Sequence, residues 1–518
     1  MLAAAAPPLA FLAVAFVWPL AAVTRRALST GALAEVLTDP GLRSVAWFTL
    51  WQAALSTALT MAVALPMAGV LARYRFPGRA LVQAVVTVPF VLPTVVVGAA
   101  FLAVLPVRWH GTVAAILLAH VFFNYAVVVR VVGALWQHLD PRLDEAARML
   151  GAPPWRVFTD VTLPLLRPAL VAAASVVFLF TFTSFGAVLL LGGPRHPTLE
   201  VEIYRLTVAR FDLPAAAAVA LLQLAFLAAL LGWWTWSQGR HARALRLRPA
   251  STSRPPRTRG ERLWVTGNLA VAVLLLGIPL ARLVQRSLQV GEGYGLAWWR
   301  LLDDRASTLG AAPLDALATS LRTAAVATAA AVVLGGLAAV AVAASGRLGR
   351  VLDTGLMLPL GTSAVTAGFG LLLVSGRLGL RGSWVLVPLA HALVALPFVV
   401  RTALPVLRSI DPRQREAAAL LGASRWWVWW TVDRAALVRP LLVGAGFAFA
   451  VSMGEFGATA FLARRGTPTL PVAITDLLGR PGAANAGQAY ALAVLLAVVV
   501  TAVVLVVERA RRDGDGFW

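Results

Sequence analysis

The segments "DPRLDEAARMLGA" (140–152) and "DPRQREAAALLGA" (411–423) carry the same polar pattern at an offset of 271 residues in a chain of 518 residues. Two further blocks keep this offset: "AHVFFNYAVVVR" (119–130) with "AHALVALPFVVR" (390–401), and Phe185-Gly186 with Phe456-Gly457. Identities in three separate blocks at one offset indicate an internal repeat, so the chain has two related halves.

The residues around these polar blocks are strongly apolar. The chain is 59% hydrophobic and only 13% charged, whereas soluble domains carry roughly 25% charged residues. About 20 apolar residues cross a bilayer as a helix, and a helix satisfies its own backbone there. The sequence therefore predicts an all-α polytopic membrane protein with about twelve transmembrane helices. The predicted spans lie near residues 5–23, 46–71, 80–105, 112–136, 168–192, 213–236, 263–283, 316–343, 351–374, 384–405, 440–463 and 488–507.

The sense of the repeat follows from the number of spans between its copies. Six predicted spans separate the two polar blocks, and an even number returns the chain to the same face of the membrane. The halves are therefore predicted to be parallel six-helix repeats, unlike the inverted repeats of many secondary transporters. Residues 1–237 form the first predicted repeat and residues 263–518 the second. The first span is expected to be a retained anchor rather than a signal peptide, because it lacks a basic start.

Arginine placement predicts the orientation. The net charge is +22, and every basic residue other than histidine is arginine. The segment 238–262 has eight arginines and a single acidic residue, Glu261. Positive charge gathers on cytoplasmic loops, so this segment, both polar blocks and both termini are placed in the cytoplasm. We expect 238–262 to be a solvated linker in contact with anionic lipid. It has no basic face with interleaved aromatic residues, so nucleic-acid binding is not expected.

Each polar block has the signals of a short capped helix. Asp140-Pro141 and Asp411-Pro412 place an N-cap aspartate before a proline whose missing N–H would be unpaired there anyway. Gly151 and Gly422 are suited to the left-handed backbone of a helix end. A compact charged helix of this kind fits a cleft on a partner protein, although a single copy could also be an amphipathic loop on the membrane surface. Two copies at equivalent positions favour docking.

At these residues the chain resembles the integral-membrane subunits of binding-protein-dependent ABC importers. Their signature is Glu-Ala-Ala, three residues, Gly, and a later Leu-Pro. The matching residues are Glu145, Ala146, Ala147, Gly151 and Pro164 in the first copy, and Glu416, Ala417, Ala418 and Gly422 in the second. The second copy has "TVDRAA" (431–436) where Leu-Pro is expected, which leaves the path of its second helix open. We call 140–168 the first EAA loop and 411–440 the second.

The resemblance implies a type I ABC importer permease fold and a set of partners. Two cytoplasmic ABC ATPase subunits would each receive one EAA loop, with Glu145, Gly151, Glu416 and Gly422 as coupling residues. A substrate-binding protein would dock on the extracytoplasmic side of a bacterial inner membrane, and lipid would surround the spans. ATP hydrolysis would belong to the partners, because the chain has no phosphate-binding G-x-x-x-x-G-K-[ST] sequence. No enzymatic activity or cofactor is expected.

The fused, double-length form is most similar to thiamine-type permeases, with ferric-iron-type permeases next. The strings that carry the likeness to the thiamine type are "LLAHVFFN" (117–124), "SFGAVLLLGG" (184–193) followed by "TLEVEIYR" (198–205), and "SMGEFGATAFL" (452–462) with "TLPVAI" (469–474). The resemblance thus implies thiamine or a related small cation as cargo, with ferric iron as the alternative. A secondary transporter driven by an ion gradient is the alternative from another class.

Ionisable groups within spans are costly and usually face a cavity. Glu455 falls inside the predicted eleventh span, and its counterpart in the first repeat is Ser184. A carboxylate there would suit a cationic cargo, or it would pair with an arginine or a backbone group to fix two helices. The residues assigned to a translocation pathway are Ser184, Phe185, Gly186, Glu455, Phe456 and Gly457.

His120 and His391 occupy matching positions in two predicted spans. Repeated histidines are typical metal ligands, but the chain has no cysteine and few carboxylates near them. We expect each histidine to form a hydrogen bond between helices rather than to bind a metal ion.

Overall fold

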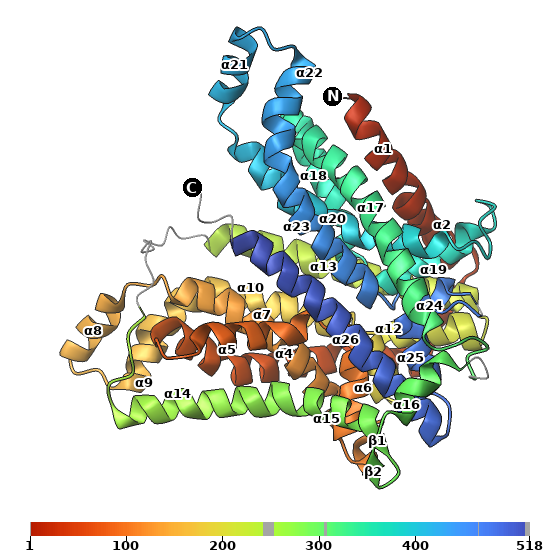
Figure 1. Ribbon diagram of the computed structural model, residues 1–518, viewed down its shortest axis with the longest axis horizontal. Helices are drawn as coiled ribbons and strands as arrows, with labels where there is room; N and C mark the ends of the chain where they lie inside the picture. The colour runs from red at the N-terminus through yellow and green to blue at the C-terminus, as the bar shows by residue number, and fades with distance from the viewer. Residues whose placement is uncertain (1, 242–252, 305–307, 465, 513–518) are drawn as a thin grey trace. The chain divides into compact units, whose positions relative to one another are not determined.

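The computed structural model describes residues 2–241, 253–304, 308–464 and 466–512, and most of them are helical (Figure 1). The chain divides into two compact units. Unit 1 comprises Met1–Thr38, Glu202–Leu224 and Ser287–Trp518, and unit 2 comprises Asp39–Val201 and Ala225–Arg286.

Unit 2 is built around three long helices that pack on one another, α4, α7 and α10. Its α-helices are α4 (Pro40–Arg73), α5 (Arg79–Val91), α6 (Thr94–Val104), α7 (Val113–Trp136), α8 (Pro141–Met149), α9 (Pro154–Arg156), α10 (Leu163–Phe182), α11 (Gly186–Leu191) and α14 (Arg259–Ala272). Its short 3₁₀ and π segments are η2 (Val107–Trp109), η3 (Val157–Thr162) and η5 (Val273–Gly277). Three helices contain a boundary between the units: α12 (Leu199–Tyr204), α13 (Leu213–His241) and α15 (Ile278–Leu288). In the three long helices, the large side chains of Met67 (α4), Phe122 (α7) and Leu166 (α10) are fully buried.

Unit 1 repeats this plan with α17, α20 and α23. Its α-helices are α1 (Leu2–Leu12), α2 (Trp18–Ser29), α3 (Ala32–Thr38), α16 (Ala297–Arg300), α17 (Asp315–Ala344), α18 (Gly346–Met357), α19 (Ala364–Ser375), α20 (Leu386–Ser409), α21 (Pro412–Leu420), α22 (Arg425–Val428), α23 (Arg434–Gly454), α24 (Thr459–Leu462), α25 (Leu470–Leu478) and α26 (Ala483–Arg512). Its other segments are η1 (Ala13–Val17), η4 (Arg205–Ala209), η6 (Leu301–Asp303), η7 (Leu358–Gly361), η8 (Trp429–Asp433) and a hairpin of β1 (Gln289–Val290) and β2 (Gly293–Tyr294).

Small residues allow the helices of unit 1 to approach closely. A Cβ atom added to Gly335 of α17 would lie 2.8 Å from Cβ of Val399 on α20. Contacts of this kind replace the hydrophobic effect as a source of helix association within lipid. The central helices are therefore packed through backbone proximity as well as through large side chains.

The first helical span of each half packs with the other half. Leu12 and Phe16, at the end of α1 and in η1, belong to one buried cluster with Leu396 and Val400 of α20. In unit 2, α14 packs against α4. The compact units therefore cross the predicted repeat boundary, since each contains the first span of the other sequence repeat.

Ten described helices are long and apolar enough to cross a membrane, and the count rises to eleven when the bent pair α5–α6 is taken as one span. This agrees with an all-α polytopic membrane protein of about twelve spans. The difference arises at 351–374, which the sequence predicts as one span. Here α18 and α19 are separate helices joined by η7, because Ser363 has an extended backbone and caps the start of α19.

The third span is broken in both repeats. In the first, α5 and α6 meet at an angle of 103°, where Leu92 and Pro93 have extended backbones. Ser363, at the break of the second repeat, is the residue that matches Leu92 at the 271-residue offset. A break at the same position in both copies shows that it belongs to the repeated plan.

The fifth span is also interrupted, which corrects the continuous spans predicted at 168–192 and 440–463. The helix α10 ends at Phe182 before α11 begins at Gly186, and α23 ends at Gly454 before α24 begins at Thr459. Hydropathy does not show these breaks, although polar residues stand at them, Ser184 in the first and Glu455 in the second.

Candidate functional site

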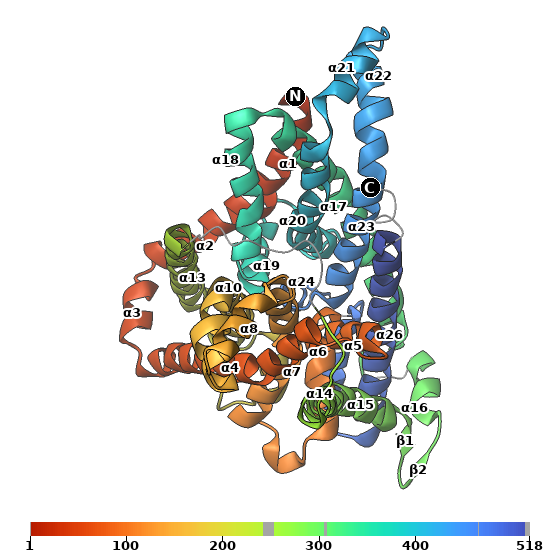
Figure 2. The same cartoon turned by 90° about the vertical axis from the view of Figure 1, so that its left-hand side faces the viewer.

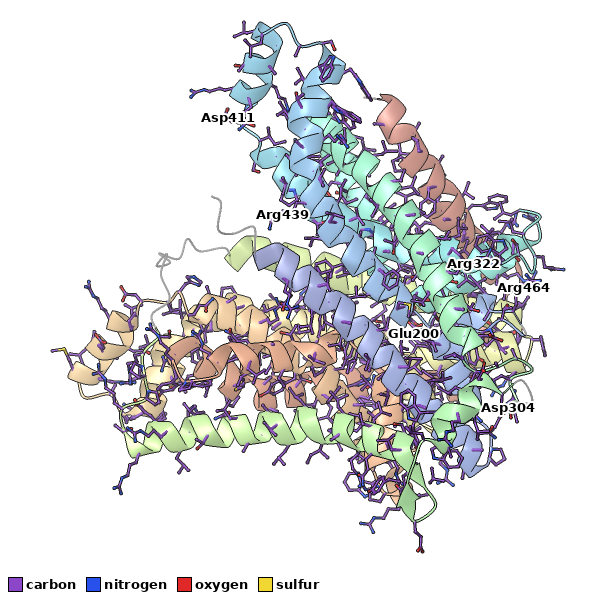
Figure 3. All side chains as sticks on the ribbon, in the orientation of Figure 1. Glu200, Asp304, Arg322, Asp411, Arg439 and Arg464 are labelled. Atoms are coloured by element: carbon purple, nitrogen blue, oxygen red, sulfur yellow. The ribbon has the colours of Figure 1, made fainter. Side chains whose placement is uncertain are left out.

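The two EAA loops start with the predicted helix caps. Asp140 accepts a hydrogen bond from the backbone N–H of Arg142 at 3.0 Å, and Asp411 accepts one from Arg413 at 2.9 Å. Proline follows each aspartate at the first helical position. Asp411 lies at the start of α21, at the outer end of unit 1 (Figure 3). The predicted starts of both helices are confirmed.

Glycine ends both helices, as predicted. Gly151 has φ +80° and Gly422 has φ +83°. Beyond each glycine, the backbone N–H of the next alanine bonds back into the helix: Ala152 to Ala147 and Ala423 to Ala418, each at 3.1 Å. This is the Schellman pattern, which needs a left-handed residue at the glycine position.

The tips of the two loops expose apolar side chains. Met149 and Leu150 are 90% and 89% exposed, and Leu420 and Leu421 are both 89% exposed. Glu145, Ala146, Glu416 and Ala417 are also exposed, whereas Ala147 and Ala418 are partly buried. Within their own units, α8 lies beyond the end of α4 (Figure 1), and α21 lies beyond the end of α20 (Figure 2). Each loop thus presents a short helix with an apolar tip and a free glutamate.

The second helical part of each loop leads into a span by the same route. In the first loop, α9 continues through the π segment η3 into α10, whose first turn contains Pro164. In the second, α22 continues through the π segment η8 into α23. The departure "TVDRAA" therefore leaves the path of the second loop unchanged.

Ionic contacts at matching positions hold each loop to its span. Asp144 of α8 pairs with Arg73 of α4 and accepts a hydrogen bond from the Thr162 hydroxyl at 3.1 Å. The residues that match Asp144 and Thr162 are Arg415 and Asp433. Arg415 Nε donates to Asp433 Oδ1 at 2.8 Å, so the matching residues are again in contact, here as an ion pair instead of a carboxylate–hydroxyl hydrogen bond.

The two matching histidines form hydrogen bonds between helices, as predicted. His120 Nδ1 lies 2.9 Å from the Ser56 hydroxyl of α4. His391 has two partners, with Nδ1 2.7 Å from the Ser452 hydroxyl and Nε2 2.7 Å from the Thr459 hydroxyl. Across the described residues, no group of three or more His, Cys, Asp or Glu side chains is arranged to hold a metal ion.

Glu455 lies in the break between α23 and α24, and the prediction that it falls within a helical span is wrong. Its carboxylate accepts hydrogen bonds from the backbone N–H groups of Ala458 at 3.0 Å and Thr459 at 3.2 Å. It also accepts one from the Thr459 hydroxyl at 2.9 Å and lies 3.3 Å from His391 Nε2. The buried carboxylate thus caps the first turn of α24 and connects it to α20.

The other residues assigned to a pathway lie at the same breaks. Ser184 and Phe185 are buried between α10 and α11, and the Ser184 carbonyl accepts a hydrogen bond from the Thr198 hydroxyl at 3.2 Å. Phe456 is buried in the second break. Gly186 begins α11, and Gly457 lies where an added Cβ would be 3.2 Å from Cβ of Ala364. Within each unit, the breaks bring these residues against the second part of the broken third span.

One feature beside the first loop has no signal in the sequence. A cleft of about 210 Å³ is lined by Glu145 and Arg148 of α8 and by Arg254 of the linker. Arg254 makes an ion pair with Glu261, which caps the start of α14. The sequence prediction of a solvated linker did not include this contact, although Pro255 and residues 257–260 are exposed; residues 242–252 lie outside the described residues. Contacts between segments so distant in sequence leave no local pattern to detect.

Comparison with known proteins agrees with the duplicated plan. The family described as "Binding-protein-dependent transport system inner membrane component" matches twice, at residues 63–240 and 331–512. The thiamine transport system permease protein ThiP of Brucella abortus (strain 2308) is 30% identical over 531 residues, covering 97% of this chain and 94% of the relative. ThiP of Escherichia coli (strain K12) is 30% identical over 480 residues, covering 86% and 85%.

A shorter relative matches a smaller part of the chain. The sulfate transport system permease protein CysT of Escherichia coli (strain K12) is 36% identical over 206 residues, covering 37% of this chain and 74% of the relative. The two family matches, the near full-length relatives and the ten or eleven apolar spans lead to one conclusion. The chain belongs to the binding-protein-dependent transport system inner membrane components, as a fused, double-length permease of the ABC importer type.

Proposed function

We propose that this chain forms the translocation pathway of an ATP-driven importer and that α8 and α21 dock two cytoplasmic ATPase subunits. The observation that carries the proposal is the pair of exposed, capped helices at matching positions, each ending in an apolar tip. An apolar tip surrounded by charged residues is typical of a surface that a partner covers. Closure of the ATPases would move the loops, and the loops would move the spans that they continue into.

The remaining parts of the importer are inferred from the family. A substrate-binding protein would deliver cargo on the extracytoplasmic face, and the ATPases would supply the energy through nucleotide binding and hydrolysis. The proposed orientation places both termini, both EAA loops and the Arg-rich linker in the cytoplasm of a bacterial inner membrane. This chain would then change between inward-open and outward-open states without hydrolysing ATP itself.

Thiamine is the proposed cargo. The near full-length relatives are thiamine transport system permease proteins, whereas the sulfate permease matches 37% of the chain. Most selectivity in such an arrangement would belong to the binding protein, and the permease would need only to let a small organic cation pass. The proposed pathway residues are those at the two fifth-span breaks: Ser184, Phe185, Gly186, Glu455, Phe456 and Gly457.

Reconstitution into liposomes tests this function. The purified chain, its ATPase and its binding protein should take up labelled thiamine only when ATP is present. Glu145→Arg and Glu416→Arg should each abolish uptake while the binding protein still binds thiamine, because these substitutions alter only the docking helices. Exposed Arg142→Glu serves as a charge-changing control on the first turn of α8. Sustained uptake by the chain with an ion gradient alone would show a secondary transporter instead.

A further inference from the structure

The linker residues Ser253–Glu261, here called the linker clip, fold back onto the end of α4. The backbone N–H of Arg254 donates to the Arg73 carbonyl at 3.0 Å, and the N–H of Arg75 donates to the Arg254 carbonyl at 2.8 Å. Arg254 thus forms a parallel bridge with Tyr74. The linker clip is joined to α4 by backbone hydrogen bonds of the kind that connect neighbouring strands.

The side chain of Arg254 is also fixed. Its guanidinium donates to both carboxylate oxygens of Glu261, with Nη1 3.1 Å from Oε2, and lies over the Tyr74 ring at 5.6 Å from its centre. The hydrogen bond to Glu261 raises the pKa of Arg254, and the charge of Glu145 on α8 acts in the same direction. A bidentate arginine–carboxylate pair combines energy with fixed geometry.

Glu261 closes the linker clip at its other end. Its carboxylate accepts hydrogen bonds from the backbone N–H groups of Arg257 at 2.7 Å and Thr258 at 3.3 Å. Thr258 in return caps Glu261 N–H at 3.1 Å, which completes a capping box at the start of α14. The linker clip is therefore an ordered turn between α4 and α14 and not a free tether.

A continuous chain of contacts leads from the linker clip to the first EAA loop. Arg73 receives the Arg254 N–H on its carbonyl, and its guanidinium pairs with Asp144 of α8. The same guanidinium donates to the Thr162 hydroxyl at 3.2 Å, and that hydroxyl donates to Asp144. The linker clip thus supports the residue that holds the base of α8, and Arg254 lines the same cleft as Glu145.

The second EAA loop is held in another way. Arg415 and Asp433 pair directly, and the residue that matches Arg73 is Ala344. The ion pair that holds the second loop therefore lies within the loop, between its two helical parts. Removal of the linker clip contacts should affect the first loop and leave the second unchanged.

We propose that the linker clip is a structural part of the first ATPase-docking site, with Arg254 as the positioning residue that holds the base of α8. The inference rests on the proposed function, because it assumes that α8 contacts an ATPase. In this proposal the linker does more than join the two halves, and different contacts hold the two docking helices in place.

Cross-linking at matched positions tests the proposal, because the chain contains no cysteine. Met149→Cys and Leu420→Cys place single thiols on the two exposed tips, which match at the repeat offset. Each is combined with Arg254→Ala in the full chain and treated with a thiol-to-amine cross-linker in the assembled transporter. Cross-linking from position 149 should fall by about 2- to 30-fold, the range of coupling that a supporting network carries. Cross-linking from position 420 should not change.

The controls separate positioning from general damage. Arg262→Ala removes an exposed arginine just beyond the linker clip and should leave both positions unchanged. Arg254→Lys keeps the charge but loses the bidentate pair, so it should give an intermediate loss at position 149. Equal losses at both positions, or an Arg254→Ala result equal to that of Arg262→Ala, would overturn the inference. Absence of any cross-link from Met149→Cys and Leu420→Cys alone would instead reject the proposed docking function.

Discussion

Three buried polar side chains and one carboxylate meet where α23 breaks. His391, Ser452 and Thr459 are all at most 3% exposed, and Glu455 is 7% exposed. The Glu455 carboxylate accepts hydrogen bonds from the backbone N–H groups of Ala458 and Thr459, which a continuous helix would have paired within its backbone. Burial of these polar groups costs little free energy only while each keeps its hydrogen-bond partners. These four side chains therefore stabilise the break between α23 and α24.

Replacing His391 with alanine should destabilise the protein more than the matching change at His120. His391→Ala removes the partner of two buried hydroxyls and a carboxylate, at a cost on the order of 1–3 kcal/mol for groups left unsatisfied. His120→Ala removes one hydrogen bond, to Ser56, and leaves a cavity of similar size. Thermal unfolding of the two variants in the same detergent measures the difference. An equal or larger loss of stability for His120→Ala would contradict this role for the four side chains at the break.

Single residues were predictable where their signal is local. The helix caps Asp140 and Asp411 and the end at Gly151 follow from neighbouring residues, and the structure confirms them. The inter-helix hydrogen bonds of the histidines followed from their repeated apolar setting. The bond between His391 and Glu455 was not predicted, because residues on different helices carry no spacing that relates them.

At the scale of secondary-structure elements, the length of each docking helix depends on its terminal glycine. A left-handed backbone costs an ordinary L-residue roughly 1–2 kcal/mol, and a β-branched residue tolerates it least. At Gly151 and Gly422 no other atom lies within 4 Å of an added Cβ, so any effect of substitution comes from the backbone and not from a clash.

A substitution series at Gly151 should follow this backbone preference. Gly151→Asn should retain most ATPase binding, because asparagine adopts the left-handed region with little strain. Gly151→Val should extend or distort α8 and weaken ATPase binding by about tenfold, which corresponds to roughly 1.4 kcal/mol. Binding of the ATPase to the detergent-solubilised variants provides the measurement. If valine and asparagine behaved alike, the terminal turn would not control docking.

The ion pair between Arg415 and Asp433 allows a test of how α21 is held. Arg415→Asp and Asp433→Arg should each reduce ATP-coupled uptake, because each places like charges side by side. The double variant should recover much of it, since it restores an ion pair of opposite direction. The pair is partly exposed, so its own contribution is expected to be about 0.5–1 kcal/mol. A double variant as weak as the sum of the two single variants would show that the pair is not what holds the loop.

The broken spans show where sequence patterns stop being informative about elements. The runs at 168–192 and 440–463 are mainly apolar, apart from residues such as Ser184 and Glu455, and hydropathy alone predicts uninterrupted helices. The breaks depend on close approach between elements of each unit: an added Cβ would lie 2.7 Å from Leu190 at Gly98, and 2.4 Å from Ala458 at Gly368. Replacement of Gly368 with alanine should therefore lower thermal stability clearly more than the same change at half-buried Gly355, where the added atom meets nothing.

At the scale of the whole molecule, duplication explains most of what could be predicted. The offset of 271 residues relates the three core helices of unit 2 to those of unit 1, and the broken third and fifth spans recur at matching positions. The exchange of the first spans between the compact units was not predicted from the sequence. Membership of the compact units is decided by packing between distant segments.

The parallel sense of the repeats is the claim on which the proposed mechanism depends, since two ATPases can act together only from one face. Membrane-impermeant maleimide tests it directly on single Met149→Cys and Leu420→Cys variants in sealed vesicles of known orientation. Both thiols should react only when the reagent reaches the cytoplasmic face. Reaction of the two thiols from opposite faces would contradict the account.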